Sequence, residues 1–298
     1  MKKICLLFLI LFGGCSTKDV CKRADLLDLS NESMSFIHGK EFVMGDYGDK
    51  FGDKPPKEVL LSNFYIDKAE ITNGIYREYI KANSCNAKKP PYIDDPIYGA
   101  DELPVVGVTY SEAEKFCKFY EKRLPTEAEW EYSARGGLDN KKFPWGDEES
   151  GDFMNYRGSN NSWAVPIMSY PANGYGLYDM AGNVREWVAD TYEKDFYKYS
   201  CLKSPLNLKF SSAITDGLKG LYKSNCYKDP INQEKGIYRV NRGGSWSYAD
   251  GYPNSVSFRG FDLPSARYND LGFRCAADAK KESWIIKKIK SFRDEESN

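Results

Sequence analysis

Histidine is almost absent from this chain of 298 residues, which contains a single one, His38. One imidazole cannot build a multi-histidine metal centre, and we assign His38 a structural or surface role rather than a place in a Ser–His triad. No C-x-x-C pair occurs, so a zinc ribbon and a thioredoxin-like redox site have no support. A basic surplus is lacking too. With 42 Lys and Arg against 43 Asp and Glu, no charge pattern argues for nucleic-acid binding.

The apolar run near the N-terminus, ICLLFLILF (4–12), is too short to span a bilayer. It follows two lysines and ends in small residues before Cys15. This order resembles a bacterial lipoprotein signal, in which the cysteine is lipid-modified and becomes the mature N-terminus. We therefore predict a signal peptide over 1–14 and an exported protein held at the membrane of the cell envelope through Cys15. A plain secretory signal or a short anchor is the alternative.

Export changes how the eight cysteines are interpreted. If the signal peptide is cleaved as predicted, Cys5 is lost with it and Cys15 carries the lipid. An even number of cysteines then remains outside the cytosol, which favours disulfide bonds over a metal cluster. These six are Cys21, Cys85, Cys117, Cys201, Cys226 and Cys275.

Aromatic side chains are abundant, at 15% of all residues with 22 tyrosines, while the hydrophobic content of 41% is ordinary. This favours an irregular fold held together by aromatic contacts over a helical bundle. No internal repeat or linker divides the sequence, so we predict one domain over 36–279, preceded by a polar tether over 15–35. The basic amphipathic segment over 280–298 either lies on a membrane surface or packs on the domain.

A stretch rich in lysine and tyrosine interrupts the domain over 191–236 and contains Cys201 and Cys226. We interpret it as a surface insertion and predict a disulfide bond between these two cysteines. The pairing of Cys21 and Cys85 stays open.

Helical signals concentrate in the first half of the domain. FYIDKAEITNGIYREYIKAN predicts a strand followed by a helix that begins after Thr72, with Ile75 among its inward-facing residues. TYSEAEKFCKFYEKRLP predicts a second helix, with a capping box from Ser111 to Glu114. Its apolar residues recur at i, i+3, i+4 and i+7, which is typical of an amphipathic helix.

The segment RLPTEAEWEYSARGG predicts a third short helix, capped by Thr126 with Glu129 closing the box and Gly136 ending it. Its glutamates raise the question of a paired-carboxylate hydrolase. Since Glu129 has a capping role, and Glu127 and Glu131 are expected on the polar side of the helix, we favour a structural interpretation. Beyond this helix the sequence is dense in Gly, Pro, Asn and aromatic residues, which predicts turns and short strands.

Five long motifs follow one another along the chain: KRLPTEAEWEYSARGG, FPWGDE, NGYGLYDMAGNVREW, NRGGSW and NDLGFRCA. In this order they resemble the formylglycine-generating-enzyme family, also called the sulfatase-modifying-factor family. The resemblance runs from Phe36 to Ala277. It implies a single α+β domain of this type, related to the C-type lectin fold, with little regular secondary structure and short helices packed on small antiparallel sheets.

The resemblance also implies what chemistry to expect. Active members bind copper through two cysteines after the GGS motif and use oxygen to convert a substrate cysteine to formylglycine. Here Tyr248 stands at the first position and the second falls near Pro253, and no cysteine occurs between Cys226 and Cys275. Copper(I) requires soft thiolate ligands, so we expect neither copper nor catalytic residues. A divergent oxidoreductase that modifies an exported protein such as a sulfatase is the alternative.

Calcium is the metal that the resemblance leaves open. Family members bind calcium through backbone carbonyls and the glutamate of the GNVREW loop, which carries over to Gly182, Val184 and Glu186. A second family site carries over to Asn155, although its later aspartate falls here near Ser159 or Asn160. The alternative is that Glu186 forms a buried ion pair with an arginine.

The family's structural disulfide carries over to Cys117 and Cys275. Without its thiols, the former substrate groove becomes a candidate binding surface for a peptide, a glycan or an envelope protein. We therefore expect a binding or scaffold module of the cell envelope rather than an enzyme. The arginines near this groove either line an anion or peptide site or tie strands together. The residues expected to form the residual pocket are Trp187, Ser245, Trp246, Tyr248 and Arg259.

Overall fold

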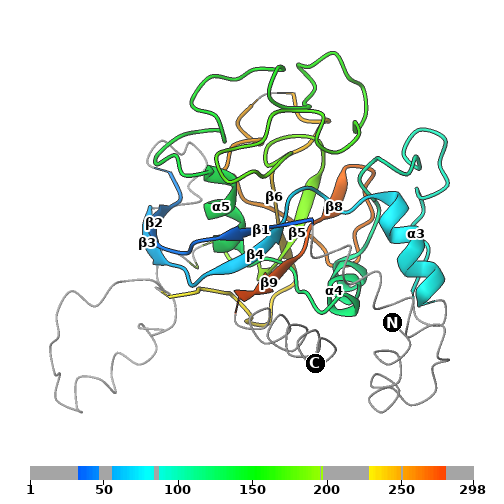
Figure 1. Cartoon of the computed structure of the whole chain (residues 1–298), viewed down its shortest axis with the longest axis horizontal. Helices are drawn as coiled ribbons and strands as arrows, with labels where there is room; N and C mark the ends of the chain where they lie inside the picture. Colours follow the sequence, from blue (N-terminus) through cyan, green and yellow to red (C-terminus); the bar gives the residue numbers. More distant parts are fainter. Residues whose placement is uncertain are drawn as a thin grey trace, which may run out of the picture.

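The computed structural model describes residues 33–46, 56–83, 87–194, 196, 228–249 and 251–279 (Figure 1). Several predictions concern residues outside these ranges and stay predictions. They are the signal peptide and lipid anchor, the Cys201–Cys226 bond, the pairing of Cys21 and Cys85, and the C-terminal segment. Within the described ranges, no helix is both long enough and apolar enough to cross a membrane.

The structure confirms a single domain with low regular secondary structure, built from a few short helices and small sheets. A three-stranded antiparallel sheet joins the two ends of the domain in the order β1 (Met34–Ile37), β4 (Phe64–Asp67) and β9 (Ala276–Asp278). A separate antiparallel pair consists of β2 (Glu41–Met44) and β3 (Lys57–Leu60).

The third sheet carries the loops of interest. Its order is β7 (Gly260–Asp262), β6 (Arg239–Arg242), β5 (Arg185–Thr191) and β8 (Leu271–Phe273). Only the β5–β8 pairing is parallel, which the long chain connection between these two strands permits. The NRGGSW motif therefore leaves the end of β6 directly beside the GNVREW motif that leads into β5.

Helix α5 (Glu127–Arg135) begins and ends as its sequence predicts. The Thr126 hydroxyl accepts from the Glu129 backbone N–H at 3.1 Å, and the Glu129 carboxylate accepts from the Thr126 N–H at 2.8 Å. Gly136 ends the helix with a φ of 56°, a left-handed conformation that glycine adopts without steric cost.

The other two helices depart from prediction in detail. Helix α4 (Tyr110–Phe119) begins two residues earlier than expected, because Thr109 and Glu112 form the capping box instead of Ser111 and Glu114. Both pairs fit the same S/T-x-x-E pattern, and the earlier start allows Tyr110 to be buried.

Helix α3 (Asn73–Ala82) is capped by Thr72 as predicted. Its buried face consists of Asn73, Tyr76 and Tyr79, whereas Ile75 is 41% exposed. The expectation that Ile75 faces the core was therefore wrong.

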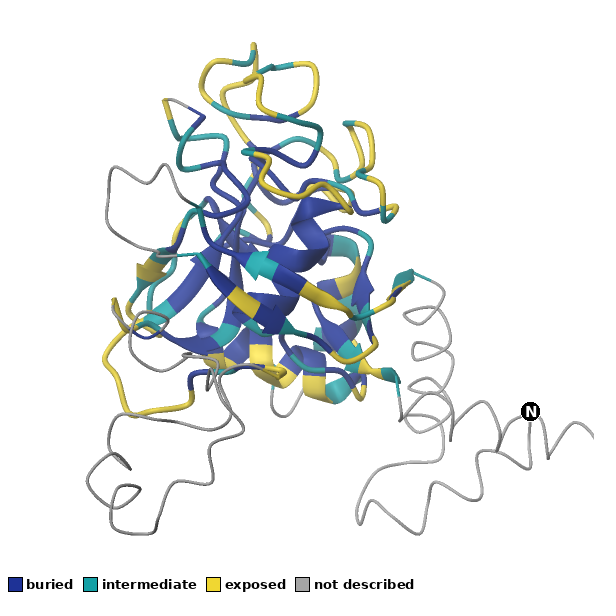
Figure 2. Cartoon of the chain, turned by 90° about the vertical axis from the view of Figure 1, so that its left-hand side faces the viewer, coloured by how far each residue is buried: buried dark blue, intermediate teal, exposed yellow. Residues whose placement is uncertain are grey.

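The predicted Cys117–Cys275 disulfide is confirmed, with the two Cα atoms 5.7 Å apart. It ties α4 to the short connection between β8 and β9 and lies in a core of aromatic rings that includes Phe116 and Phe273, which meet edge to face. Figure 2 shows this core as buried, while exposed residues gather on the loops between α5 and β5. Those loops form the upper part of Figure 1 and position the candidate site.

Candidate functional site

Beneath the candidate site lies a buried network of arginines and glutamates. The Arg259 guanidinium donates to both oxygens of Glu127, at 2.6 and 2.9 Å. Arg242 and Arg135 contact the two oxygens of Glu131, at 2.5 and 2.6 Å. Glu127 and Glu131 are 0% exposed, so the expectation that they lie on the polar side of α5 was wrong. The expected bonds from Arg242 and Arg259 to carboxylates are present, but they tie β6 and the residue before β7 to helix α5 rather than strand to strand.

The GGSW loop turns sharply after β6. Gly243 and Gly244 have φ values of 94° and 70°, which side-chain-bearing residues rarely adopt. A Cβ atom on Gly244 would lie only 2.1 Å from the Asn254 amide oxygen. These glycines let the loop fold back on residues 253 and 254. The backbone N–H of Trp246 then donates to the Asn183 carbonyl at 2.9 Å.

Behind this loop, two serines and an arginine converge on Asp270. The hydroxyls of Ser245 and Ser247 donate to its carboxylate at 2.8 and 3.0 Å, and Arg185 donates at 2.6 Å. Burial alone would raise the pKa of Asp270, but the Arg185 charge and these hydrogen bonds hold it below its ordinary value. The serines act here as donors to a fixed carboxylate, and the chain's single imidazole, on His38, lies outside this cluster.

Tyr248 is half-buried at the end of the same loop. Burial raises the pKa of its phenol, an effect that the nearby Arg185 charge only partly opposes, so the hydroxyl stays protonated at neutral pH. The Tyr248 carbonyl accepts from the Arg157 backbone N–H at 3.0 Å. This bond joins the GGSW loop to the loop formed by residues 155–165.

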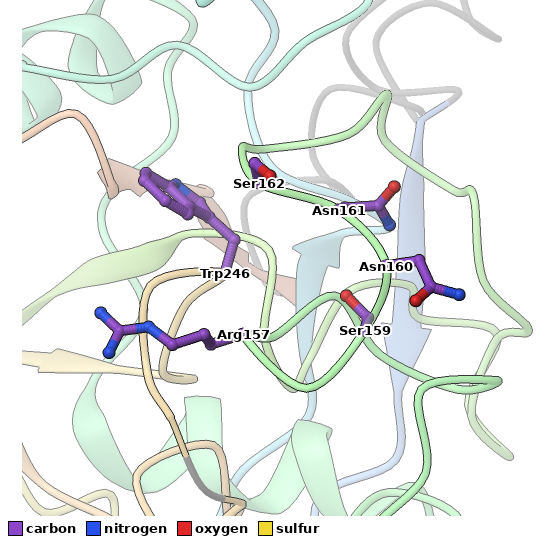
Figure 3. A pocket seen from close by; sticks show the side chains of 6 residues that line it. All are labelled: Arg157, Ser159, Asn160, Asn161, Ser162 and Trp246. Atoms are coloured by element: carbon purple, nitrogen blue, oxygen red, sulfur yellow. The ribbon is translucent and has the colours of Figure 1, made fainter.

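An open pocket of about 340 Å³ lies between these two loops (Figure 3). Trp246 stands on one side of it, and the remaining lining side chains come from the facing loop. The lining residues are Arg157, Ser159, Asn160, Asn161, Ser162 and Trp246.

Of the five residues predicted to form a residual pocket, Trp246 lines this one. Ser245 and Tyr248 lie on the same loop but not in the pocket wall. Trp187 is 0% exposed, with its indole N–H donating to the Val108 carbonyl at 3.0 Å. Together with Arg259, bound to Glu127, it belongs to the core and not to the surface pocket.

The predicted metal residue Asn155 anchors the pocket loop. Its buried amide N–H groups donate to the Trp163 carbonyl at 2.8 Å and to the Asn183 amide oxygen at 3.3 Å. Its amide oxygen accepts from the Ser159 hydroxyl at 3.0 Å. Asn183 in turn accepts from the Val165 N–H at 3.0 Å. These bonds fix both ends of the lining segment before any ligand arrives.

Glu186 forms the buried ion pair that was the alternative to calcium binding. Arg274 donates to both of its oxygens at 2.7 Å, and the Trp130 indole N–H adds a bond of 2.8 Å. Protein donors thus occupy both oxygens of Glu186 and the side-chain oxygen of Asn155. The side chains of Asn155 and Glu186 are therefore engaged by protein donors, and calcium binding by the carbonyls of Gly182 and Val184 stays a prediction. Among the described residues, no group of three or more His, Cys, Asp or Glu side chains is placed to hold a metal ion.

Sequence reasoning missed a pair of buried carboxyl groups, Glu70 and Asp179. Within the described ranges, Glu70 Oε2 and Asp179 Oδ1 have no N–H or hydroxyl donor. The two carboxyl groups are close enough for the charge of one to act on the other. Burial and the Asp179 charge raise the pKa of Glu70 well above its ordinary value. They lie 109 positions apart in the sequence, and no local pattern marks them.

Comparison with known proteins agrees with this architecture. A family model described as the sulfatase-modifying factor enzyme 1-like domain matches residues 21–279. The chain belongs to this family. A formylglycine-generating enzyme of Streptomyces coelicolor is 30% identical, covering 82% of this chain and 88% of its own length.

Two further comparisons show the range of proteins that contain this domain. The serine/threonine-protein kinase pkn1 of Chlamydia caviae is 33% identical over 83% of this chain, but the chain spans only 38% of that kinase. The solved structure of PvdO from Pseudomonas aeruginosa has a TM-score of 0.64 and 25% identity, covering 82% of this chain and 94% of PvdO. The sulfatase-modifying-factor domain thus accounts for the fold of the described chain, while the activity must be argued from its own site.

Proposed function

We propose that this chain is a non-catalytic sulfatase-modifying-factor domain, exported and anchored in the cell envelope, that acts as a binding or scaffold module. The observation that carries the proposal is Tyr248, a protonated phenol at the position where the family resemblance expects the first reactive thiol. Beside it lies an open pocket rather than a filled core.

The chemistry of the surrounding residues supports a loss of catalysis. Hydroxyl and carboxylate groups surround the loop, and these hard ligands are poor partners for copper(I). The two cysteines of the described chain are joined in the Cys117–Cys275 disulfide, which supplies no free thiolate. Asp270 is held ionised by Arg185, so it is not a proton donor near neutral pH.

The alternative is a divergent oxidoreductase acting on an exported protein such as a sulfatase. The 30% identity to a formylglycine-generating enzyme favours this reading, because the scaffold around the loop is retained. The replacement of both thiol positions speaks against it. The two proposals differ in one product, a peptide aldehyde.

A peptide aldehyde assay tests the proposal. The full chain is incubated with copper, oxygen and a cysteine-containing sulfatase-type peptide, and the peptide is then examined for the aldehyde by mass spectrometry. We expect unmodified peptide. Aldehyde that requires both the chain and oxygen would establish the alternative.

The proposed location rests on Cys15 and has its own test. Metabolic labelling with a fatty acid should mark the wild-type chain and should fail to mark a Cys15→Ala variant, which should leave the membrane fraction. Labelling of the variant to the wild-type level would contradict the lipid anchor.

A further inference from the structure

We propose that the pocket between Trp246 and residues 157–162 binds an acidic saccharide. The inference deepens the proposed binding function and rests on it. The lining combines one indole ring, two primary amides, two hydroxyls and one guanidinium, and it includes no aliphatic side chain and no carboxylate (Figure 3).

The polar part of this lining matches a ligand rich in hydroxyl groups. The amides of Asn160 and Asn161 offer donors and acceptors, although one Asn161 N–H already donates to the Tyr170 hydroxyl at 3.1 Å, and the Ser162 hydroxyl can both donate and accept. The Ser159 hydroxyl donates within the loop, to the Asn155 amide oxygen at 3.0 Å, and helps to hold the pocket wall. Three polar side chains along one short loop suit a sugar ring, whose hydroxyl groups both donate and accept hydrogen bonds. A peptide would instead require pockets for apolar side chains or a free strand edge, and the lining provides neither.

The aromatic part provides a flat surface for a sugar ring. Trp246 lies against Tyr98 and Trp163, with ring centroids 6.4 Å apart in both cases. Trp163 is 48% exposed. The C–H groups of a pyranose face are apolar and pack on such rings, while its hydroxyls remain free to reach the amides.

Arg157 supplies the preference for an acidic ligand. Its guanidinium forms no hydrogen bond or ion pair with any side chain of the described residues, and the pocket contains no acidic residue to neutralise it. Other arginines of the domain, by contrast, bind carboxylates, as Arg259 and Arg274 do. A free guanidinium beside neutral donors favours a ligand carboxylate, which it can bind through two hydrogen bonds.

The pocket is also held in place without a ligand. Asn155 fixes the loop through the Trp163 carbonyl, and the Arg157 N–H is bonded to the Tyr248 carbonyl. A ligand therefore does not have to order this backbone, which reduces the entropic cost of binding.

The test is isothermal titration of the full chain in detergent with acidic saccharides, namely trigalacturonic acid, N-acetylmuramic acid and sialyllactose. The methyl ester of trigalacturonic acid provides a neutral probe of the same skeleton, and a tri-glutamate peptide provides an acidic probe of another class. Arg157→Gln, Arg157→Lys and the double variant Asn160→Ala/Asn161→Ala probe the pocket. Lys235→Gln removes an exposed positive charge elsewhere and serves as the matched control.

We expect at least one acidic saccharide to bind, and its affinity to fall about ten-fold or more in Arg157→Gln and on methyl esterification. Arg157→Lys should retain most of the affinity, the double Asn variant should weaken acidic and neutral probes alike, and Lys235→Gln should change nothing. Absence of binding by all three saccharides, equal binding by Arg157→Gln, or tighter binding of the tri-glutamate peptide would overturn the inference. If the saccharides fail and the aldehyde assay is also negative, the acidic-saccharide inference is rejected while the proposed loss of catalysis is supported; aldehyde formation would instead reject the proposed function itself.

Discussion

Arg274 and Glu186 form a fully buried bidentate ion pair, with both N–O distances at 2.7 Å. It links β5 to the residue after β8, directly behind the loops that form the pocket. The pair gives the glutamate of the GNVREW motif a structural role, because the buried Arg274 charge would be costly without a partner.

Glu186→Gln should therefore destabilise the domain by about 3–5 kcal/mol, since it leaves the Arg274 charge buried without its partner. Urea unfolding measures the change. The control Glu78→Gln removes one partner of the exposed Glu78–Lys81 pair and should cost about 0.5 kcal/mol or less. If Glu186 were a calcium ligand instead, chelation would lower wild-type stability to that of the variant, which would contradict the ion-pair account.

Asp190 should make stability depend on pH. Burial, together with the nearby Glu127 charge, raises its pKa from 3.8 to about 7, although the N–H groups of Glu127 and Asn232 and the Arg259 charge oppose the shift. Because the folded state binds the proton more tightly, this stabilising contribution is complete below about pH 4 and is lost as pH rises through 7. The loss should amount to a few kcal/mol at most.

Thermal unfolding of wild type and Asp190→Asn between pH 4 and 8 separates this contribution from those of other carboxyls. The variant should lose the downward slope of stability between pH 4 and 7. It should also be less stable at low pH, because its amide cannot accept from both N–H groups. If stability fell with pH by the same amount in both proteins, another titrating group, and not Asp190, would be responsible.

Glu70→Gln should stabilise the domain by about 1 kcal/mol or more near neutral pH. The substitution removes one of two neighbouring buried carboxyl groups, and the new amide can donate to Asp179 while its oxygen still accepts from Asn183. Equilibrium unfolding in chelator is the measurement. The contrary result would be a variant less stable than the wild type, together with added calcium that stabilises the wild type but not the variant. That result would show that these carboxyl groups hold a cation.

Removal of the Cys117–Cys275 disulfide should cost about 2–5 kcal/mol, because the bond closes a loop of 158 residues in the unfolded chain. The double variant Cys117→Ala/Cys275→Ala should match the reduced wild type in urea unfolding. Alkylation of Cys117 as a free thiol in unreduced protein would contradict the assignment.

The sequence predicted the ends of a helix correctly where contacts between near neighbours in the chain determine them. Thr126, Glu129 and Gly136 predicted both ends of α5, since caps involve neighbours within four residues. At α4 two overlapping capping patterns competed, and burial of Tyr110 decided between them. Burial of that kind depends on the whole fold.

Long-range partners explain the rest. Glu127 appeared polar because Arg259, its partner, lies 132 positions away, and Arg242 lies 111 positions from Glu131. The pocket was predicted from the GGSW loop together with Trp187 and Arg259, which the fold places in the core. Its facing wall comes from a segment with no periodicity, which long-range contacts of Asn155, Asn183 and the Arg157 backbone N–H bring alongside.

The measurement that tests the central claim most directly is the amount of peptide aldehyde formed by the full chain with copper and oxygen, beside the Streptomyces coelicolor enzyme as a positive control. The account predicts conversion by the control and none by this chain above the protein-free background. It also predicts that Tyr248→Phe leaves that result unchanged. Oxygen-dependent aldehyde formation by the wild-type chain would contradict the claim that this domain binds without catalysing.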